Sequence, residues 1–403
     1  MKHIVVVMLN NTGLRKGAII NYIIISLFCV SLNSCANYGK NGHEVEVDIE
    51  NTSDVNYSRF FENIDFIQLE IPIDEIFGNT GKVFFTKGYI GLLDNSRNSV
   101  WIFTESGDYV SRIDIVIGEG PGEVKMLSDA TFGKEGEVHV LGVFSIKTFD
   151  YNGELLEEIE TPFLARNFEF LPNENGFITF MNNEYTTLEG ERDNNFYNLI
   201  IYDRRGNLVK KYLPISQQKK NLNLLLLSNF YTYKDTLHHY SFLDKNIYKI
   251  NALDNVSVKY NIDYQENEIP ESIYRERENF ETGMSFLEEN IFSSDYPYLN
   301  SVMETENYLI IGISYNEKRG VLFFNKINQK SEFVTRDKFH NDFIPGMDIY
   351  FHLNYENAVY GIKSAAEILN FIGNTEEKTE VINELYKRIS KNDGPVLIKA
   401  KVK

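Results

Sequence analysis

The chain has 403 residues and a net charge of −18, with 43% hydrophobic residues, 14% aromatic residues and only nine prolines. This composition excludes an intrinsically disordered chain and provides enough apolar residues for a large ordered core. The negative charge repels nucleic acid at long range, so nucleic acid is excluded as a partner.

The N-terminus has the features of a secretory signal peptide. Arg15 and Lys16 precede an apolar run over residues 18–30, which is too short and too interrupted for a comfortable membrane span. The sequence Leu32-Asn33-Ser34-Cys35 then matches a lipoprotein cleavage box, in which the cysteine thiol is alkylated by a diacylglyceryl group. We therefore predict a signal peptide over residues 1–34, starting at Met1 or Met8, and lipidation at Cys35.

The distribution of cysteine supports the lipidation of Cys35. The chain has two cysteines, Cys29 and Cys35, so its main body contains neither a disulfide scaffold nor a cysteine-based zinc site. Simple secretion, with Cys35 as an incidental small residue, is the alternative. Residues 35–58 begin with a polar, Gly- and Asn-containing stretch that is typical of a tether. Through an acylated Cys35, a lipid membrane is the first predicted partner.

From about residue 82 the chain carries a loose repeat. Each unit has an alternating apolar strand, a short turn, a second strand that ends in an aromatic residue, and a turn whose Gly or Asn supplies a positive φ. One four-stranded sheet of this kind cannot bury both of its faces, whereas radial stacking of several sheets buries them. Six copies, one of them degenerate, lie near residues 89–113, 138–156, 199–209, 237–250, 308–328 and 347–361.

The repeat predicts an all-β fold, a six-bladed β-propeller over residues 59–403 with short helical insertions. The longer gaps between repeats, 265–298 and 372–394, hold these insertions, and residues 376–390 have the spacing of an amphipathic helix. Closing the ring requires the first and last blades to be joined. We predict that strands 64–70 and 395–402 complete the last blade.

Several short motifs together carry a family resemblance. They are the cleavage box at Cys35, the strand Ile67-Gln68-Leu69-Glu70, the loop Gly118-Glu119-Gly120-Pro121-Gly122-Glu123, the repeats that end in [FY]-[DN]-x-x-G, and the closing segment 392–397. With these motifs, residues 59–403 resemble a Bacteroidetes family of six-bladed β-propeller lipoproteins. The resemblance implies the fold and the envelope compartment but no catalytic residue. More distantly, it implies kinship with NHL-like propellers, which are mostly binding modules.

The loop Gly118–Glu123 superficially matches a phosphate-binding loop. However, Pro121 removes a backbone N–H donor, Glu123 replaces the third glycine of the fingerprint, and no clear helical pattern follows. We therefore interpret the loop as a structural turn between the first two blades. Glu119 and Glu123 in this turn are the candidate ligand-binding residues, near the rim of the central channel.

The histidines show no spacing typical of metal ligands. His238 and His239 are adjacent, so in a strand their side chains face opposite sides, and His139, His340 and His352 are scattered. We predict no cofactor, no metal site and no catalytic residue.

The favoured function is that of a cell-envelope lipoprotein whose propeller binds an unknown small-molecule, glycan or protein ligand. The alternative is a metal-dependent hydrolase or lactonase-like enzyme, in which acidic residues of several blades would hold calcium in the channel. A purely structural lipoprotein is a third interpretation. We predict an outer-membrane location, facing either the periplasm or the cell surface.

Overall fold

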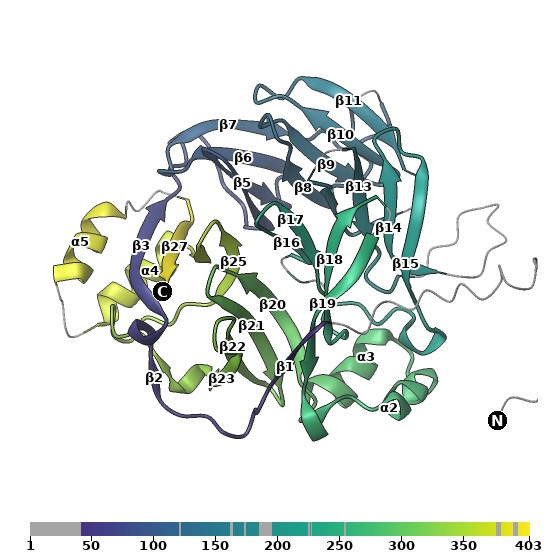
Figure 1. Cartoon of the computed structure of the whole chain (residues 1–403). Coiled ribbons are helices and arrows are strands. Elements are labelled where there is room, and N and C mark those ends of the chain that lie inside the picture. Colours follow the sequence, from purple (N-terminus) through teal and green to yellow (C-terminus); the bar gives the residue numbers. More distant parts are fainter. Residues whose placement is uncertain are drawn as a thin grey trace, which may run out of the picture. The chain divides into compact units, whose positions relative to one another are not determined.

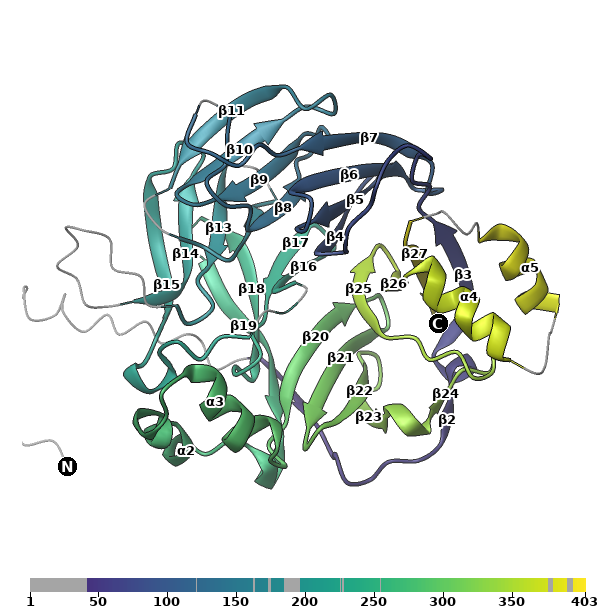
Figure 2. The same ribbon diagram turned by 180° about the vertical axis from the view of Figure 1, so that it is seen from behind.

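The computed structural model describes residues 42–403 except 121, 162–163, 173–174, 185–195, 225, 227, 254, 376–379 and 390–393. The predicted signal peptide over residues 1–34 and the lipidation site Cys35 lie outside the described residues. In the described part, six sheets surround a common centre as the blades of a β-propeller, and they are antiparallel except for one parallel strand added to blade 4 (Figures 1 and 2). The predicted fold class is therefore confirmed.

The strands of each blade follow one another from the centre outwards. Blade 1 contains β4 (Lys82–Thr86), β5 (Tyr89–Asp94), β6 (Ser99–Thr104) and β7 (Tyr109–Asp114). Blade 2 contains β8 (Asp129–Phe132), β9 (Val138–Gly142), β10 (Ser145–Phe149) and β11 (Leu155–Glu160). Blade 3 contains β12 (Asn167–Phe170), β13 (Gly176–Phe180), β14 (Tyr197–Asp203) and β15 (Leu208–Pro214).

The remaining blades differ in how they begin and end. Blade 4 contains β16 (Phe230–Tyr233), β17 (Thr236–His239), β18 (Asn246–Ala252), β19 (Asn255–Asp263) and, as a fifth strand, β1 (His43–Glu46). Blade 5 contains β20 (Tyr298–Glu304), β21 (Tyr308–Tyr315), β22 (Lys318–Asn325) and β23 (Lys330–Thr335). Blade 6 contains β25 (Phe351–Tyr355), β26 (Ala358–Lys363), β27 (Val396–Val402) and β3 (Phe61–Gln68).

The repeated Asx-x-x-Gly sequence forms the turns between the third and fourth strands of blades 2 and 3. In blade 2, the Oδ1 atom of Asp150 accepts hydrogen bonds from the backbone N–H groups of Asn152 and Glu154, at 2.9 and 2.8 Å. Gly153 has a φ of +83°, a left-handed conformation that glycine adopts at low cost. Asp203 and Gly206 repeat this arrangement in blade 3. The turn chemistry therefore determines where β11 and β15, the outer strands of these two blades, begin.

Blade 6 closes the ring with strands from both ends of the chain. β27 pairs antiparallel with β3, from Val396 opposite Gln68 to Val402 opposite Phe61. The predicted closure is confirmed. Between blades 6 and 1, Leu397 and Tyr360 lie in one buried cluster with Trp101, so closure also buries apolar surface between neighbouring blades.

The N-terminal segment corrects the predicted tether. β1 pairs in parallel with β19, and β2 (Val55–Asn56) pairs with β24 (Phe339–His340), so residues 43–58 belong to the propeller. Val45 and Val47 are fully buried. The reason is visible in the sequence His43-Glu44-Val45-Glu46-Val47-Asp48-Ile49, whose strict alternation is typical of a half-buried strand. The tether predicted over 35–58 is therefore wrong from residue 43 onwards.

The helical insertions lie in the predicted gaps, except for one helix that begins at Ala365, before the gap predicted over 372–394. Between β19 and β20 the chain forms α2 (Glu271–Arg275), α3 (Gly283–Leu287) and a π-helical turn at Glu288–Phe292. Between β26 and β27 lie α4 (Ala365–Asn374) and α5 (Glu380–Arg388), which pack on blade 6. Short 3-10 turns complete the chain at Tyr57–Arg59, Gln217–Lys219, Gln265–Asn267, Glu276–Asn279 and Arg336–Lys338. None of the helices in the described ranges is long and apolar enough to cross a membrane.

Candidate functional site in the central cavity

A cavity of about 790 Å³ lies at the centre of the propeller, where the first strands of all six blades meet. Exposed side chains at its rim come from the turns that follow these strands. Among them are Lys87, Lys134, Lys234, Asp235 and Glu356. The full lining consists of Lys82–Lys87, Thr131–Lys134, Glu169–Pro172, Ser228, Phe230–Asp235, Leu237, Tyr240, Val302 and His352–Glu356.

Aromatic rings form a large part of the cavity wall. Phe85 of blade 1 and Tyr355 of blade 6 stack with ring centroids 5.2 Å apart and an angle of 15° between the rings. Across the cavity lining, Tyr233 of blade 4 lies beneath the ammonium group of Lys326, whose Nζ is 4.0 Å from the ring centroid. These contacts fix the rings in place, so the cavity presents preformed aromatic surface.

Blades 1 to 3 are joined at the cavity by one buried lysine and two carboxylates. The Nζ atom of Lys82 lies 3.0 Å from Asp129 Oδ1 and 3.1 Å from Glu169 Oε1. Asp129 also accepts hydrogen bonds from the backbone N–H groups of Ala130 and Phe168, at 2.9 and 3.1 Å. The side chain of Lys82 is 7% exposed and that of Glu169 is 20% exposed, so this triad forms part of the cavity wall.

The charges of this triad are set by burial and by one another. Burial alone would lower the pKa of Lys82, but the carboxylates of Asp129 and Glu169 outweigh it and raise that pKa, so the lysine is charged. Burial raises the pKa of Glu169, and the nearby charge of Asp129 adds to this effect while Lys82 opposes it. The pKa of Glu169 therefore lies above the ordinary value of a glutamate carboxyl group.

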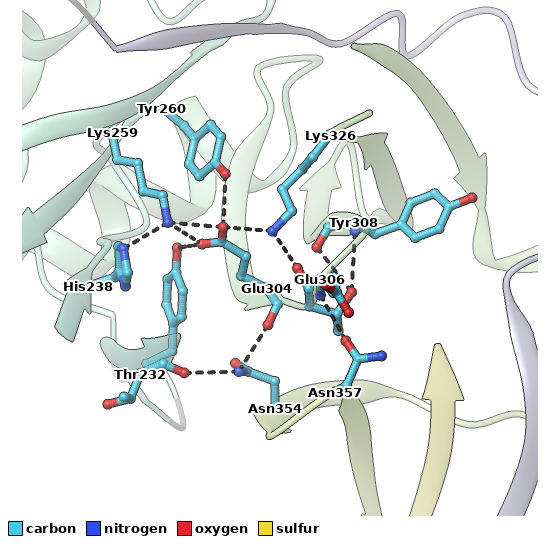
Figure 3. Close-up of polar contacts among 12 residues, drawn as sticks. Thr232, His238, Lys259, Tyr260, Glu304, Glu306, Tyr308, Lys326, Asn354 and Asn357 are labelled. Atoms are coloured by element: carbon cyan, nitrogen blue, oxygen red, sulfur yellow. Dashed lines mark hydrogen bonds and ion pairs between the residues drawn. The ribbon is translucent and has the colours of Figure 1, made fainter. Parts of the chain in front are cut away.

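Blades 4 to 6 are joined by a second buried cluster, centred on Glu304 at the end of β20 (Figure 3). Lys259 donates to both carboxylate oxygens of Glu304, at 2.7 and 2.9 Å, and Lys326 donates at 3.1 Å. The hydroxyl groups of Tyr231 and Tyr260 donate to the same carboxylate at 3.2 and 2.9 Å. Only 1% of the Glu304 side chain is exposed, and it has the bonding partners that a buried charge requires.

A β-bulge brings Lys259 to this cluster. Tyr260 pairs with Ile247, but the next paired residues are Val258 and Tyr248, so Lys259 is an extra residue in β19. Adjacent residues of a regular strand point to opposite faces, whereas here both Lys259 and Tyr260 reach Glu304.

The pKa shifts in the Glu304 cluster follow from its composition. Burial alone would raise the pKa of Glu304, but the charges and hydrogen bonds of Lys259 and Lys326 lower it overall, so the carboxylate is ionised. Burial lowers the pKa of Lys259 despite the attraction of Glu304. Burial, together with the charge of Lys259, lowers the pKa of His238 to about 3, so His238 is neutral and its Nε2 accepts from Lys259 at 2.9 Å.

Asn354 of β25 links blade 6 to blades 4 and 5. Its Nδ2 donates to the backbone carbonyl oxygens of Thr232 and Glu304, both at 3.3 Å (Figure 3). Residues of blades 4, 5 and 6 are therefore bonded to one another beside the cavity. Together with the Lys82 triad, the Glu304 cluster holds all six first strands in position around the cavity.

The two candidate residues from the sequence lie elsewhere. The loop that contains them connects β7 to β8, as predicted for a turn between blades 1 and 2. Glu119 is exposed and forms an ion pair with Lys125 at 2.9 Å, which lowers the pKa of Glu119. Glu123 accepts a hydrogen bond from the backbone N–H of Gly120 at 2.8 Å. Neither residue is among those that line the central cavity, and their role in ligand binding stays a prediction.

The histidines do not converge. His139, His238, His239 and His352 are buried in three different blades, whereas His340 is exposed and pairs with Asp54. In the described ranges, no three His, Cys, Asp or Glu side chains are grouped as metal ligands would be. The hydrolase alternative stays a prediction.

No local sequence pattern identified the residues that shape the cavity. Lys82, Asp129, Glu169 and Glu304 lie in short first strands, which the repeat did not reveal because its recognisable part covers the later strands of each blade. A usable signal exists in hindsight, since each of these charged residues lies beside apolar residues rather than in a polar turn, as in Lys82-Val83-Phe84-Phe85. Single-sequence patterns do not show that such residues come together.

Comparisons with known proteins agree with the fold. The sequence profile of a family described as "Domain of unknown function (DUF4934)" matches residues 41–401. The crystal structure of BF0058 from Bacteroides fragilis NCTC 9343, provisionally described as an exported protein, matches with a TM-score of 0.72 and 17% identity over 89% of this chain and 99% of that one. At this identity the likeness shows the fold alone.

A second structure is more distant. A DUF4221 family member from Bacteroides vulgatus ATCC 8482 has a TM-score of 0.48 and 12% identity, over 85% of this chain and 97% of that one, and it supports no argument about function. No curated protein matches this sequence. The resemblance to a Bacteroidetes propeller family, inferred from sequence motifs, is confirmed by the family profile and by BF0058.

Proposed function

Since this chain belongs to the family described as "Domain of unknown function (DUF4934)", whose name assigns no activity, we propose its function from its own residues. The chain is a cell-envelope binding protein that holds a small ligand in the central cavity of its propeller. The observation that carries this proposal is the cavity itself. Its volume of about 790 Å³ is within the range of small-molecule sites, roughly 300–1,000 Å³.

The lining supports binding more than it supports a purely structural role. A structural core is closed and apolar, whereas this cavity has fixed aromatic rings next to exposed lysines and carboxylates at its rim. The two buried ionic clusters hold the first strands without filling the cavity. This combination of a rigid wall with a few polar groups is typical of preformed ligand sites.

Binding in the cavity is tested by blocking it. Thr86 lines the cavity and is half-buried, so Thr86→Trp places a large ring inside it, whereas Lys330→Trp adds the same ring on the exposed outer strand of blade 5. Thermal-shift measurements on both variants would use a panel of sugars, peptides, nucleotides and lipid headgroups. A stabilisation that persists in Lys330→Trp and is lost in Thr86→Trp supports the proposal. If no compound stabilises the unmodified protein, or if Thr86→Trp responds equally, the proposal fails.

We also propose that acylated Cys35 anchors the propeller to the outer membrane, facing either the periplasm or the cell surface. The support is the cleavage box Leu32–Cys35 and the lack of other cysteines after it. Metabolic labelling with palmitate should mark the protein without substitutions in the membrane fraction. The Cys35→Ser variant should be unlabelled and released from the membrane. Protease treatment of intact cells then distinguishes the two orientations. A protein that faces the cell surface is cleaved, whereas one that faces the periplasm is protected. Labelling of Cys35→Ser would contradict the assignment.

A further inference from the structure

We propose that the ligand of the central cavity is a neutral, polyhydroxylated molecule, of which a short oligosaccharide is the natural class. This inference rests on the proposed function and identifies its ligand. It follows from three properties of the lining: flat aromatic surface, groups that donate or accept hydrogen bonds, and a nearly balanced charge.

The aromatic surface matches the apolar faces of sugar rings. A pyranose exposes several C–H groups on one face, and these pack against an aromatic ring in the same way that other apolar groups do. Phe85 and Tyr355, stacked at 5.2 Å, and Tyr233 all line the cavity and are partly exposed there. Because they come from blades 1, 6 and 4, the aromatic surfaces lie on different parts of the wall, so an extended ligand can contact more than one of them.

The polar groups match hydroxyl groups, which both donate and accept hydrogen bonds. Glu169 is 20% exposed and has acceptor capacity beyond its bonds to Lys82 and Thr131. Burial lowers the pKa of His352, whose Nδ1 bonds to the Tyr350 carbonyl oxygen at 3.0 Å, so its Nε2 is an acceptor. Lysine ammonium groups at the rim are donors.

The charge of the lining argues against a charged ligand. The lining contains four lysines and three carboxylates, although the whole chain has 40 basic and 58 acidic residues. Lys82 is already paired with Asp129 and Glu169, and Asp235 and Glu356 lie at the rim with the other lysines. The three carboxylates of the lining would repel a polyanion, and its four lysines would repel a polycation. A neutral polar ligand meets neither repulsion.

An apolar ligand fits less well. It would cover the rim lysines and carboxylates without giving them hydrogen-bond partners, and each group buried in this way costs free energy. Hydroxyl groups replace the lost water contacts of both donors and acceptors. A neutral sugar is therefore the class that uses the whole lining.

The experiment is a calorimetric titration of the full chain with Cys35→Ser, which removes the proposed acylation site. The probes are four neutral trisaccharides (cellotriose, mannotriose, xylotriose and chitotriose), trigalacturonic acid and a neutral tripeptide. At least one neutral trisaccharide should bind more tightly than trigalacturonic acid and the tripeptide. Tyr355→Ala and Glu169→Gln should each weaken this binding by about tenfold. Tyr386→Ala removes a half-exposed tyrosine of α5 and should leave the affinity unchanged.

Each other result overturns the inference. Tighter binding of the anionic sugar or of the peptide in the cavity contradicts a neutral sugar ligand but leaves the proposed binding function standing. A neutral sugar whose affinity is unaffected by both Tyr355→Ala and Glu169→Gln binds elsewhere. If none of the four trisaccharides binds at millimolar concentration, the inference is wrong, and the cavity-blocking variant then decides separately whether the cavity binds any ligand.

Discussion

The carboxylate of Glu304 in blade 5 lies 2.7 Å from the ammonium group of Lys259 in blade 4, although only 1% of the Glu304 side chain is exposed. Lys326 provides a second cation at 3.1 Å. Removing one partner of a buried ionic group leaves an uncompensated charge. This relationship makes the fold sensitive to substitution of Glu304.

Glu304→Gln should destabilise the propeller by about 3–5 kcal/mol, because two largely buried lysines lose their counter-charge. Urea unfolding of the full chain measures this loss. Glu306→Gln, two residues further on and exposed, is the matched control and should change the free energy of unfolding little. Equal effects of both substitutions would show that the Glu304 cluster does not stabilise the fold.

The buried triad should show coupling between its members. Lys82→Met leaves Asp129 and Glu169 without their cation and should be destabilising, again by about 3–5 kcal/mol. Adding Glu169→Gln removes part of the unpaired negative charge, so the double variant should be more stable than the sum of the single effects by about 0.5–3 kcal/mol. Strict additivity in a double-mutant cycle would contradict the triad.

The buried histidines predict a loss of stability in mild acid. Burial lowers the pKa of His139, His238 and His239 to about 3, whereas an unfolded histidine has a pKa near 6.5. Below about pH 6.5 the unfolded chain binds protons that the folded protein excludes. Stability should therefore fall as the pH decreases from about 6.5 to about 3, by up to about 1.4 kcal/mol per pH unit for each histidine.

His239→Leu tests this linkage. The variant should lower the slope of unfolding free energy against pH, between pH 6 and pH 4, by about one proton. Between pH 7.5 and pH 9 the two proteins should have the same slope, because His239 is neutral there in both the folded and the unfolded state. An unchanged slope in the acidic range would rule out a neutral buried His239.

The N-terminal strand predicts a sharp contrast between neighbouring residues. Val45 of β1 is fully buried against the core of blade 4, whereas its neighbour Glu44 is exposed. Val45→Asp should destabilise the protein by several kcal/mol because a carboxylate would be buried without a partner, and Glu44→Ala should have little effect. If the two variants were equally stable, residues 43–58 would belong to the tether predicted over 35–58 and not to the propeller.

Ring closure predicts the effect of removing β27. Without residues 395–403, β26 and β3 lose the strand that lies between them, and the buried residues Leu397 and Ile398 are removed. The shortened chain should lose its cooperative unfolding transition in thermal and urea denaturation. A cooperative transition at unchanged stability would contradict closure by β27.

The fold was largely predictable because its signals are local. The turn sequences Asp150–Gly153 and Asp203–Gly206 specify hairpins through bonds within four residues, and the alternating strands on either side follow from them. The closing strands were predictable because Ile64–Glu70 and Pro395–Val402 have the mixture of apolar and polar residues typical of strands and have no partner in the repeat. Helix α4 was missed although Ser364 and Glu367 form a capping box that the sequence shows.

The cavity was not predictable because it depends on distant pairings. Lys82 and Glu169 are 87 residues apart, and Lys259 reaches Glu304 only because a bulge turns it. No local pattern reports such contacts. The candidate residues Glu119 and Glu123 lie in the turn between blades 1 and 2 that the sequence predicts, where Glu123 accepts a hydrogen bond from Gly120, and their role in ligand binding stays a prediction.

The pairing of β3 with β27 has a consequence for how the protein is made. β3 is among the first strands of the propeller to be synthesised, and β27 follows it by more than three hundred residues. The ring therefore stays open, with β3 lacking its strand partner, until β27 has been synthesised. Long-range closure of this kind is slow and exposes strand edges meanwhile.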